Sequence, residues 1–269
     1  MKIQFKLFIK SFLLSFIILS IVSAIIITSI YIDKSSIDPT EKESLILLGL
    51  TNNERVISLT MMHFDPKENE IKFLPVPDNT WINDNTILQD LYSNSDLEPL
   101  ISNIELLTGA RINRYLFLSV DALSSLTQRM GKISFYISNK FVNETNGSSY
   151  HGMCDLNGEL VKTMFTYSGY DLSVVSISDI SLSFLMTFLS ESCSDLSISD
   201  LSNELLADSN SLHVSTNLSS KEIGKYCELL SSYQTLAHTT LNLRGETHTN
   251  KSSKYFIPEK LTSDQNIFD

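Results

Sequence analysis

Basic residues are scarce in this chain. Among 269 residues, 20 are Lys or Arg and 31 are Asp or Glu, which gives a net charge of −11. A protein that binds a nucleic-acid backbone neutralises phosphates with clustered Lys and Arg, so the acidic balance argues against nucleic acid as a partner. Charged residues make up 19% of the chain and hydrophobic residues 42%. This apolar content is enough for one large domain or two small ones.

The common catalytic and metal-binding motifs are also missing. The sequence contains no P-loop, no glycine-rich dinucleotide fingerprint, no G-x-S-x-G elbow and no H-E-x-x-H pair, which removes the usual nucleotide, hydrolase and zinc classes. No histidine-held metal site is indicated, and no catalytic residue is assigned. The five histidines are scattered without the spacing of metal ligands: His63, His151, His213, His238 and His248.

Cysteine is too rare for a disulfide scaffold. The three cysteines, Cys154, Cys193 and Cys227, lie far apart in the sequence. An odd number cannot form a complete set of bridges in an exported chain. One bridge or three structural thiols are both compatible with the sequence.

A long apolar run stands out against these absences. Residues 11–32 contain no charge, and a helix of that length crosses a hydrocarbon core of roughly 30 Å. Lys2, Lys6 and Lys10 precede it, so the positive-inside rule predicts a cytoplasmic N-terminus, residues 1–10, and a single-pass type II membrane protein. A cleaved signal peptide is the alternative, because Val22-Ser23-Ala24 resembles a cleavage site.

The rest of the chain is expected outside the cell membrane. Residues 33–43 are polar and read as a tether, residues 44–258 as one extracytoplasmic domain, and residues 259–269 as a C-terminal tail. This exterior holds 17 Lys and Arg against 31 Asp and Glu, about −14 in net charge. An anionic partner would therefore have to be held by local groups or by a bound cation.

Short apolar runs alternate with helical patterns in this exterior, which predicts an α/β domain with helices on both faces of a sheet. The polar stretch 139–154 is predicted to be a mobile loop. The strands are expected at 45–48, 56–64, 71–76, 115–118 and 133–137. The helices are expected at 97–107, 120–130, 157–167, 180–189, 201–206 and 221–233.

The order and spacing of several segments resemble the LytR-CpsA-Psr (LCP) family. The likeness covers about residues 44–190, and residues 214–219 resemble the end of the same domain. The segments that carry it are 45–49, 60–67, 71–80, 88–92, 104–109, 112–115, 131–133 and 156–159.

The resemblance implies a three-layer α/β/α domain with a central mixed sheet. It also implies an activity: transfer of a glycopolymer from a polyprenyl pyrophosphate to peptidoglycan, with Mg²⁺. A pyrophosphate site needs arginines for bidentate contacts and carboxylates to hold the cation. Arg111 and Arg114, three residues apart, could face a phosphate as a pair.

The sequence departs from the family pattern where that chemistry is expected. The two acidic residues of the family fall near Thr51 and Leu59, and the arginine of its proline-arginine-aspartate-threonine block falls at Asp78. A later arginine pair falls at Thr166 and Ser168. Charge-assisted contacts are individually worth about 1.5–3 kcal/mol, so the resemblance predicts a retained fold with weak or silent transfer chemistry and lost Mg²⁺ ligands.

Three functions are compatible with these residues. The first is a silent LCP-like protein that binds an envelope lipid, a polymer, peptidoglycan or a partner enzyme. The second is an active phosphotransferase that uses Arg111, Arg114, Asp78 or Asp84 as substitutes, and the third is an anchored surface adhesin or sensor. Binding of a polyprenyl chain would require that the pocket beneath Thr80 and the helix at Asn157 is long, apolar and open. The candidate pocket residues are Thr51, Asp78, Asn79, Thr80, Arg111, Arg114, Asn157, Thr166 and Ser168.

Overall fold

The computed structural model divides the chain into two units, Met1–Ile37 and Asp38–Asp269. It describes residues 39, 43–53, 55–83, 86–93, 96–170, 177–195, 214–231, 235–250, 253–259 and 266–268. The predicted N-terminus 1–10, the predicted transmembrane helix 11–32 and the predicted helix 201–206 lie outside these residues. None of the helices described is both long and apolar enough to cross a membrane.

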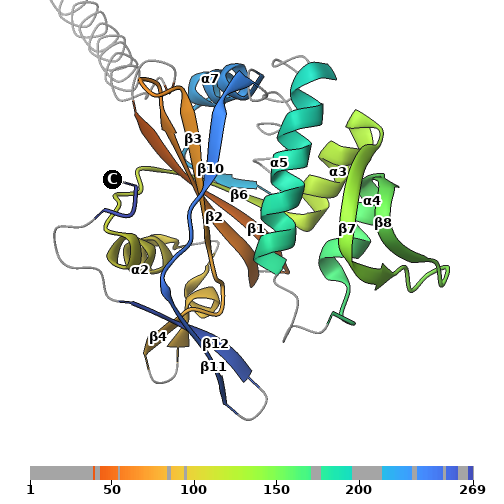
Figure 1. Cartoon of the computed structure of the whole chain (residues 1–269), viewed down its shortest axis with the longest axis horizontal. Coiled ribbons are helices and arrows are strands. Elements are labelled where there is room, and N and C mark those ends of the chain that lie inside the picture. Colours follow the sequence, from red (N-terminus) through yellow and green to blue (C-terminus); the bar gives the residue numbers. More distant parts are fainter. Residues whose placement is uncertain are drawn as a thin grey trace, which may run out of the picture. The chain divides into compact units, whose positions relative to one another are not determined.

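A mixed six-stranded sheet forms the centre of the second unit, in the order β10-β3-β2-β1-β6-β9 (Figure 1). β1 pairs with β2 in antiparallel and with β6 in parallel orientation. β3 pairs antiparallel with β2 and parallel with β10, and β9 closes the other edge antiparallel to β6. The strands are β1 (Ser44–Asn52), β2 (Arg55–Asp65), β3 (Glu70–Val76), β6 (Arg114–Ser119), β9 (Val214–Thr216) and β10 (Ala237–Thr240).

Helices cover both faces of this sheet, which confirms an α/β domain with a central mixed sheet. The apolar core on one face includes residues of α3 (Val120–Met130), α4 (Gly158–Thr166), α5 (Ile177–Asp195) and α7 (Ser220–Ser231). The core on the other face includes residues of α2 (Glu98–Thr108) and of the short 3₁₀ helix η1 (Leu88–Leu91). Figure 1 shows α5 and α2 on opposite sides of the sheet.

Alternation of side chains along the central strands divides the two cores. Ile46 and Leu50 of β1 face the core of α5, whereas Leu47 faces the core of α2. Gly49 leaves room for the ring of Phe117, because a β-carbon at Gly49 would lie 2.1 Å from that ring. Strands with apolar residues on both faces are typical of a sheet buried between two helix layers.

Within the part of the chain that the structure describes, three two-stranded hairpins accompany this sheet. They are β4 (Trp81–Asn83) with β5 (Thr86–Ile87), β7 (Ile133–Val142) with β8 (Ser149–Leu156), and β11 (Gly245–Asn250) with β12 (Ser253–Pro258). The predicted mobile loop at 139–154 was wrong, because most of it forms the end of β7 and all but the last two residues of β8. The polar residues there are the exposed side of a strand, since exposure alternates along β8 and Cys154 is a half-buried free thiol.

The end of the described chain returns to the sheet. Phe268 is 5% exposed in the core of α2, and its ring stacks on His63 of β2 at 5.0 Å between centroids. Lys72 Nζ donates to the Phe268 carbonyl at 2.8 Å, and the Ile267 amide donates to the Thr108 carbonyl at 3.0 Å. Residues of the predicted C-terminal tail therefore belong to the packing of the domain.

Candidate functional site

The carboxyl ends of three strands, β1, β3 and β6, meet at one end of the sheet, which we call the carboxyl edge. β1 and β6 run parallel, with Thr51 opposite Ser119. β3 runs in the same direction as β1, because β2 lies between them and is antiparallel to both. Helix α3 begins directly after β6, where the Ser119 hydroxyl accepts a hydrogen bond from the Ala122 amide at 3.0 Å. Ligands of open α/β sheets bind at this kind of edge.

An apolar cavity of about 130 Å³ lies between the sheet and helices α3 and α5. Its sheet side is formed by β1, β2 and β6, and α4 contributes Phe165. The apolar side chains that line it are Leu48, Leu50, Leu116, Leu118, Leu123, Leu126, Phe165, Phe184, Leu185 and Phe188. Sites for drug-sized ligands usually have roughly 300–1,000 Å³, so this cavity has room for part of an apolar chain.

Few polar groups reach this cavity. Ser58 and Thr60 of β2 lie on its sheet side and are 3% and 4% exposed. The Ser181 hydroxyl of α5 is buried and has no hydrogen-bond partner among the residues that the structure describes. Such a lining suits a ligand segment without polar groups, because a polar ligand atom buried there would need a hydrogen-bond partner.

Among the predicted site residues, Asp78 has a clearly shifted pKa. Burial raises the pKa of its carboxyl from 3.8 to about 6, against the opposing effects of the Asn79 and Asp78 backbone amides and of Arg55. Arg55 begins β2 opposite Asn52, so it lies at the same edge of the sheet as Thr51 and Asp78. A carboxyl with a raised pKa near a guanidinium is a weaker cation ligand than an ordinary Asp, because protons and the guanidinium compete with the cation.

The remaining residues of that block stabilise a turn. The Thr80 hydroxyl donates to the Pro77 carbonyl at 2.6 Å, and Thr80 is fully buried. The Asn79 carbonyl accepts from the Phe256 amide at 3.2 Å, and Thr80 forms an isolated bridge with Phe256. Asn79 and Thr80 thus hold the β11–β12 hairpin against the turn after β3, and neither lines the apolar cavity.

Thr51 belongs to the sheet edge by position. Its side chain is 7% exposed, and its hydroxyl donates to the Leu118 carbonyl of β6 at 3.3 Å. Leu59 is fully buried in the core of α2, on the other face of the sheet from the cavity. The two positions at which the family pattern places acids therefore hold a threonine tied to a backbone carbonyl and a core leucine.

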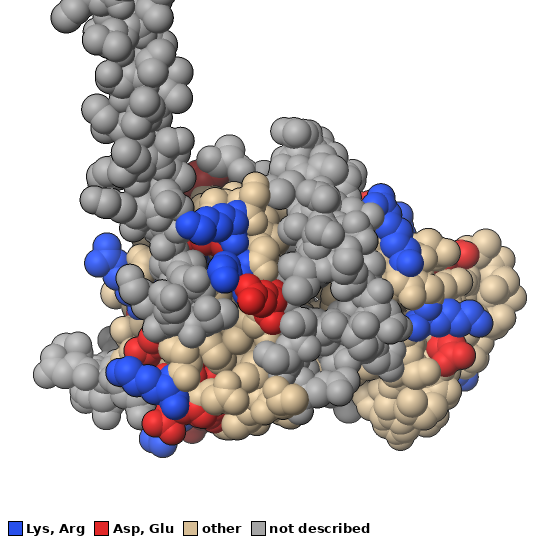
Figure 2. All heavy atoms as spheres, turned by 90° about the horizontal axis from the view of Figure 1, so that it is seen from above, with Lys and Arg blue, Asp and Glu red and all other residues tan. Residues whose placement is uncertain are grey.

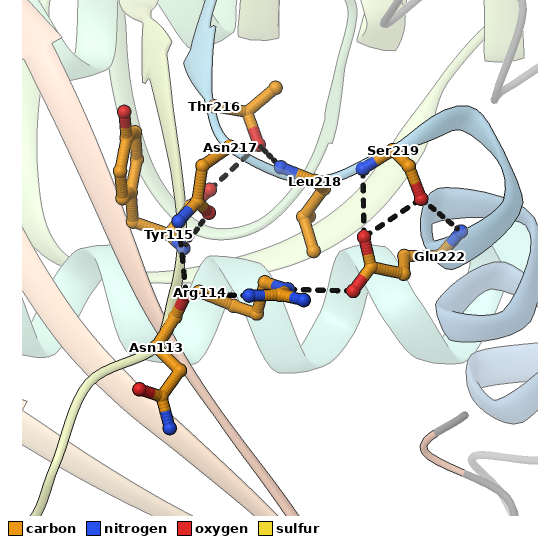
Figure 3. A network of polar contacts seen from close by, with 8 residues as sticks. All are labelled: Asn113, Arg114, Tyr115, Thr216, Asn217, Leu218, Ser219 and Glu222. Atoms are coloured by element: carbon orange, nitrogen blue, oxygen red, sulfur yellow. Dashed lines mark hydrogen bonds and ion pairs between the residues drawn. The ribbon is translucent and has the colours of Figure 1, made fainter. Parts of the chain in front are cut away.

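Arg114 and Arg111 lie at the opposite edge of the sheet. Arg114 begins β6 opposite Ile46, five residues before the Thr51–Ser119 pair. Its Nε donates to Glu222 Oε1 of α7 at 2.6 Å, and its Nη1 donates to the Asn113 carbonyl at 3.0 Å (Figure 3). The Glu222 side chain is 3% exposed and that of Arg114 17%, so the pair is a buried structural contact, while Arg111 is exposed before the strand.

Helix α4 positions the last three predicted residues. The Asn157 side chain caps this helix by accepting from the Leu160 amide at 3.0 Å. Thr166 and Ser168 are exposed at the other end of α4, next to the cavity residue Phe165, and the Thr166 hydroxyl donates to the Lys162 carbonyl at 2.8 Å. The structure thus brings Thr51, Asp78 and the turn residues Asn79 and Thr80 to one end of the sheet and places Arg111 and Arg114 at the other. Asp84 lies outside the described residues.

Among the described residues, Asp78 is the carboxylate at this end of the sheet, and it does not form a Mg²⁺ site with others. Within the described ranges, no three His, Cys, Asp or Glu side chains gather closely enough to hold a metal ion. Hard cations need several oxygen ligands, and carboxylates among them.

Surface charge gives no alternative anion site on the face shown in Figure 2, where the described Lys and Arg side chains are spread out or adjoin acidic ones.

Sequence reasoning missed two features. Arg55 beside Asp78 carried no motif, and the cavity residues of α5, such as Phe184 and Phe188, have the same apolar pattern as an ordinary core helix.

No protein-family model matches the sequence, and no curated protein matches it. Solved structures do match. TagV of Bacillus subtilis has 19% identity, covers 81% of this chain and 91% of its own, and gives a TM-score of 0.65. A protein of Enterococcus faecalis described as a transcriptional regulator has 15% identity, covers 84% and 85%, and gives 0.66.

TagT is a third similar structure, and it contains a ligand. The structure of TagT bound to LIIa-WTA has 15% identity, covers 84% of this chain and 88% of its own, and gives a TM-score of 0.63. TagT has also been seen bound to LI-WTA. TagV and TagT are LytR-CpsA-Psr proteins, and with this mixed sheet between helices the chain described here has the LytR-CpsA-Psr fold.

Proposed function

We propose that this chain is a membrane-anchored cell-envelope protein that binds a polyprenyl-linked glycopolymer and has little or no transferase activity. The observation that carries this proposal is the apolar cavity beside the carboxyl edge of the sheet, in a fold shared with TagT, which binds LIIa-WTA and LI-WTA. Part of a polyprenyl chain would occupy the cavity. Its polar headgroup would remain near Thr51 and Asp78 at the edge.

Weak or absent transfer is proposed from the state of the charged groups. Arg114 is bound to Glu222 at the far edge of the sheet, and Thr166 and Ser168 carry no charge. Each charge-assisted hydrogen bond missing from a pyrophosphate removes about 1.5–3 kcal/mol. Binding through the lipid chain does not need those groups, since each buried CH₂ contributes about 0.8 kcal/mol.

Anchoring is proposed from the sequence of residues 11–32 and the lysines before it. The domain would then face the cell envelope, where polyprenyl-linked polymers are available. Protease added to intact cells should digest residues 44–258 if this orientation is right. Protection of the domain until lysis would contradict it.

One observation favours a second candidate, an active phosphotransferase. Asp78 has a pKa raised to about 6 and lies near Arg55, at the edge where the headgroup would lie. A carboxyl poised near neutral pH beside a cation is typical of acid–base catalysis. Efficient polymer transfer that is lost in Asp78→Asn would replace the silent interpretation with this one.

The cavity can be tested by filling it. Leu185 lines the cavity from α5 and is only partly buried, so Leu185→Trp should narrow the cavity without a large loss of stability. We expect photolabelling of the full chain by a photoreactive polyprenyl pyrophosphate to fall about tenfold, a loss of roughly 1.4 kcal/mol in binding. Labelling should depend little on Mg²⁺.

The matched control is Leu106→Trp, which places the same ring on α2 where the side chain is 79% exposed. This variant should be labelled like the wild type. Equal labelling of wild type and Leu185→Trp would contradict lipid binding in the cavity.

A further inference from the structure

A second hollow lies on another side of α5, between this helix and strand β7. Its volume is about 440 Å³, within the roughly 300–1,000 Å³ of small-ligand sites. None of the residues described above as the candidate site lines it. We call it the α5–β7 groove, and α5 separates it from the apolar cavity.

Three of the four α5 residues that line this groove are polar, and the fourth is Ile180. Asp179, Ser183 and Thr187 line the groove, and their spacing of four residues places them on one stripe of α5. The Thr187 hydroxyl donates to the Ser183 carbonyl at 3.0 Å, which leaves its oxygen able to accept. The residues of α5 that line the apolar cavity, such as Phe184 and Phe188, are on a different face of the helix.

The strand wall combines an aromatic ring with amide and hydroxyl groups. Tyr136, Ser138 and Asn139 of β7 line the groove together with Phe135 and Ile137, and Tyr136 is 60% exposed. The β7–β8 pairing shifts register between Ile137 and Phe141. Such an irregularity disfavours addition of a further strand along this edge, so an extended peptide fits the wall poorly.

A buried hydroxyl without a partner completes the lining. Tyr170 is 9% exposed, and its hydroxyl has no hydrogen-bond partner among the residues described. Burial raises the pKa of this phenol to about 12, so it keeps its proton and can donate. Leaving a buried donor unpaired is unfavourable, and a ligand hydroxyl or carbonyl in the groove would satisfy it.

The chemistry of these groups identifies the ligand class. The described residues that line the groove include no Lys or Arg and do include Asp179, so an anionic polymer is disfavoured. Hydroxyl, amide and phenol groups around an exposed ring match a sugar, whose rim of hydroxyls exchanges hydrogen bonds while its apolar face packs on the ring. We infer that the α5–β7 groove binds an uncharged glycan chain.

This inference goes beyond the proposed lipid site and can be tested separately. The full chain in lipid nanodiscs would be titrated with the hexamer of N-acetylglucosamine and, in a second arm, with an uncharged extended peptide. We expect saturable binding of the hexamer and none of the peptide. Tyr136→Ala should weaken hexamer binding about tenfold, because it removes the exposed ring.

Two further variants address the groove itself. Ser183→Trp should block it from the exposed side of α5, and Tyr170→Phe should weaken binding about threefold by deleting one donor. Leu106→Ala, far away on α2, should bind like the wild type. Leu185→Trp should also bind the hexamer normally, which separates this test from that of the lipid cavity.

Several results would overturn the inference. They are the absence of saturable hexamer binding by the wild type, equal binding by wild type, Tyr136→Ala and Ser183→Trp, preferential binding of the peptide, and loss of hexamer binding in Leu185→Trp. Because Tyr136 and Ser183 are exposed, their variants should remain folded. A normal thermal melt verifies this.

Discussion

A single carboxyl group, that of Asp78, makes the stability of this domain sensitive to pH. Its pKa is about 6 in the folded protein and ordinarily 3.8, chiefly because burial disfavours the charged form. The folded state therefore holds this proton more tightly than the unfolded state does. Protonation of Asp78 stabilises the fold fully below about pH 4, and that stabilisation is lost as the pH rises through 6.

We predict that Asp78→Asn removes this pH dependence. In the wild type, the free energy of unfolding should decrease by about 2–3 kcal/mol between pH 4 and pH 7 from this group alone. Urea titrations at several pH values measure it. The amide keeps the size of the side chain without its charge, so the variant should show a flatter profile.

Asp155→Asn is the control, because Asp155 is an exposed carboxyl on β8 that accepts a hydrogen bond from Ser134. It should keep the wild-type slope. Identical slopes for wild type and Asp78→Asn would show that Asp78 is not the sensitive group.

At the scale of one helix, α7 is held by a buried network at its first turn. The Glu222 carboxylate accepts from Arg114 of β6 and from both the amide and the hydroxyl of Ser219, at 2.6, 2.9 and 2.8 Å (Figure 3). The Glu222 amide donates back to the Ser219 hydroxyl at 3.3 Å. This reciprocal pattern is a capping box, and the Arg114 guanidinium of β6 adds a charged contact to it.

We predict that breaking this pair from one side is costly. Glu222→Leu should reduce the free energy of unfolding by about 3–5 kcal/mol, because it removes the buried carboxylate that accepts from Arg114 and from the Ser219 amide and hydroxyl. The double variant Arg114→Leu, Glu222→Leu should lose less than the sum of the two single losses. Urea unfolding of all four proteins gives the coupling free energy.

The exposed pair Lys225–Glu228 on the same helix, 3.0 Å apart, serves as the comparison. Glu228→Leu should change stability by less than about 1 kcal/mol. A loss of similar size at Glu222 and Glu228 would contradict the role of the buried network.

The elements were largely predictable where the apolar pattern was regular. The predicted strands at 45–48, 56–64, 71–76, 115–118 and 133–137 are confirmed as parts of β1, β2, β3, β6 and β7. Sequence patterns missed β8 because Gly152 and the exposed Met153 interrupt the alternation of polar and apolar residues that would predict a strand. They also missed the short edge strands β9 and β10, which have too few residues for a pattern.

The candidate site was less predictable than the fold, because its residues depend on contacts between distant elements. The end of β1 and the segment after β3 were expected near a headgroup, and Thr51 and Asp78 do share one sheet edge. The sequence could not show whether Arg114 contacts a phosphate or forms a structural ion pair, because its partner Glu222 lies 108 residues later. The apolar cavity lies against β1, β2 and β6, and neither Thr80 nor Asn157 lines it.

At the scale of the whole domain, the last described segments stabilise the first strands. β10 pairs with β3, Phe256 bridges to Thr80, and Phe268 fills the core beside His63. Contacts between residues so far apart in the chain make the sheet and its C-terminal segments one cooperative unit.

We predict that Phe268→Ala destabilises the entire domain by about 3–5 kcal/mol, the usual loss for a buried aromatic side chain. The transition should remain single when followed by circular dichroism and by tyrosine fluorescence, because no separate subdomain is released. Ile257→Ala, at a side chain that is 37% exposed, should cost much less. A change of less than about 0.5 kcal/mol in Phe268→Ala would mean that this segment is dispensable.

Helix α5 lines the cavity with one face and the groove with another, and this limits where the protein can accept insertions. One extra residue rotates everything after it by about 100°. An insertion near Ser181 would therefore turn Phe184 and Phe188 away from the cavity and Ser183 and Thr187 away from the groove. Relatives with this arrangement should vary in the length of their hairpins and keep the first three turns of α5 free of insertions and deletions.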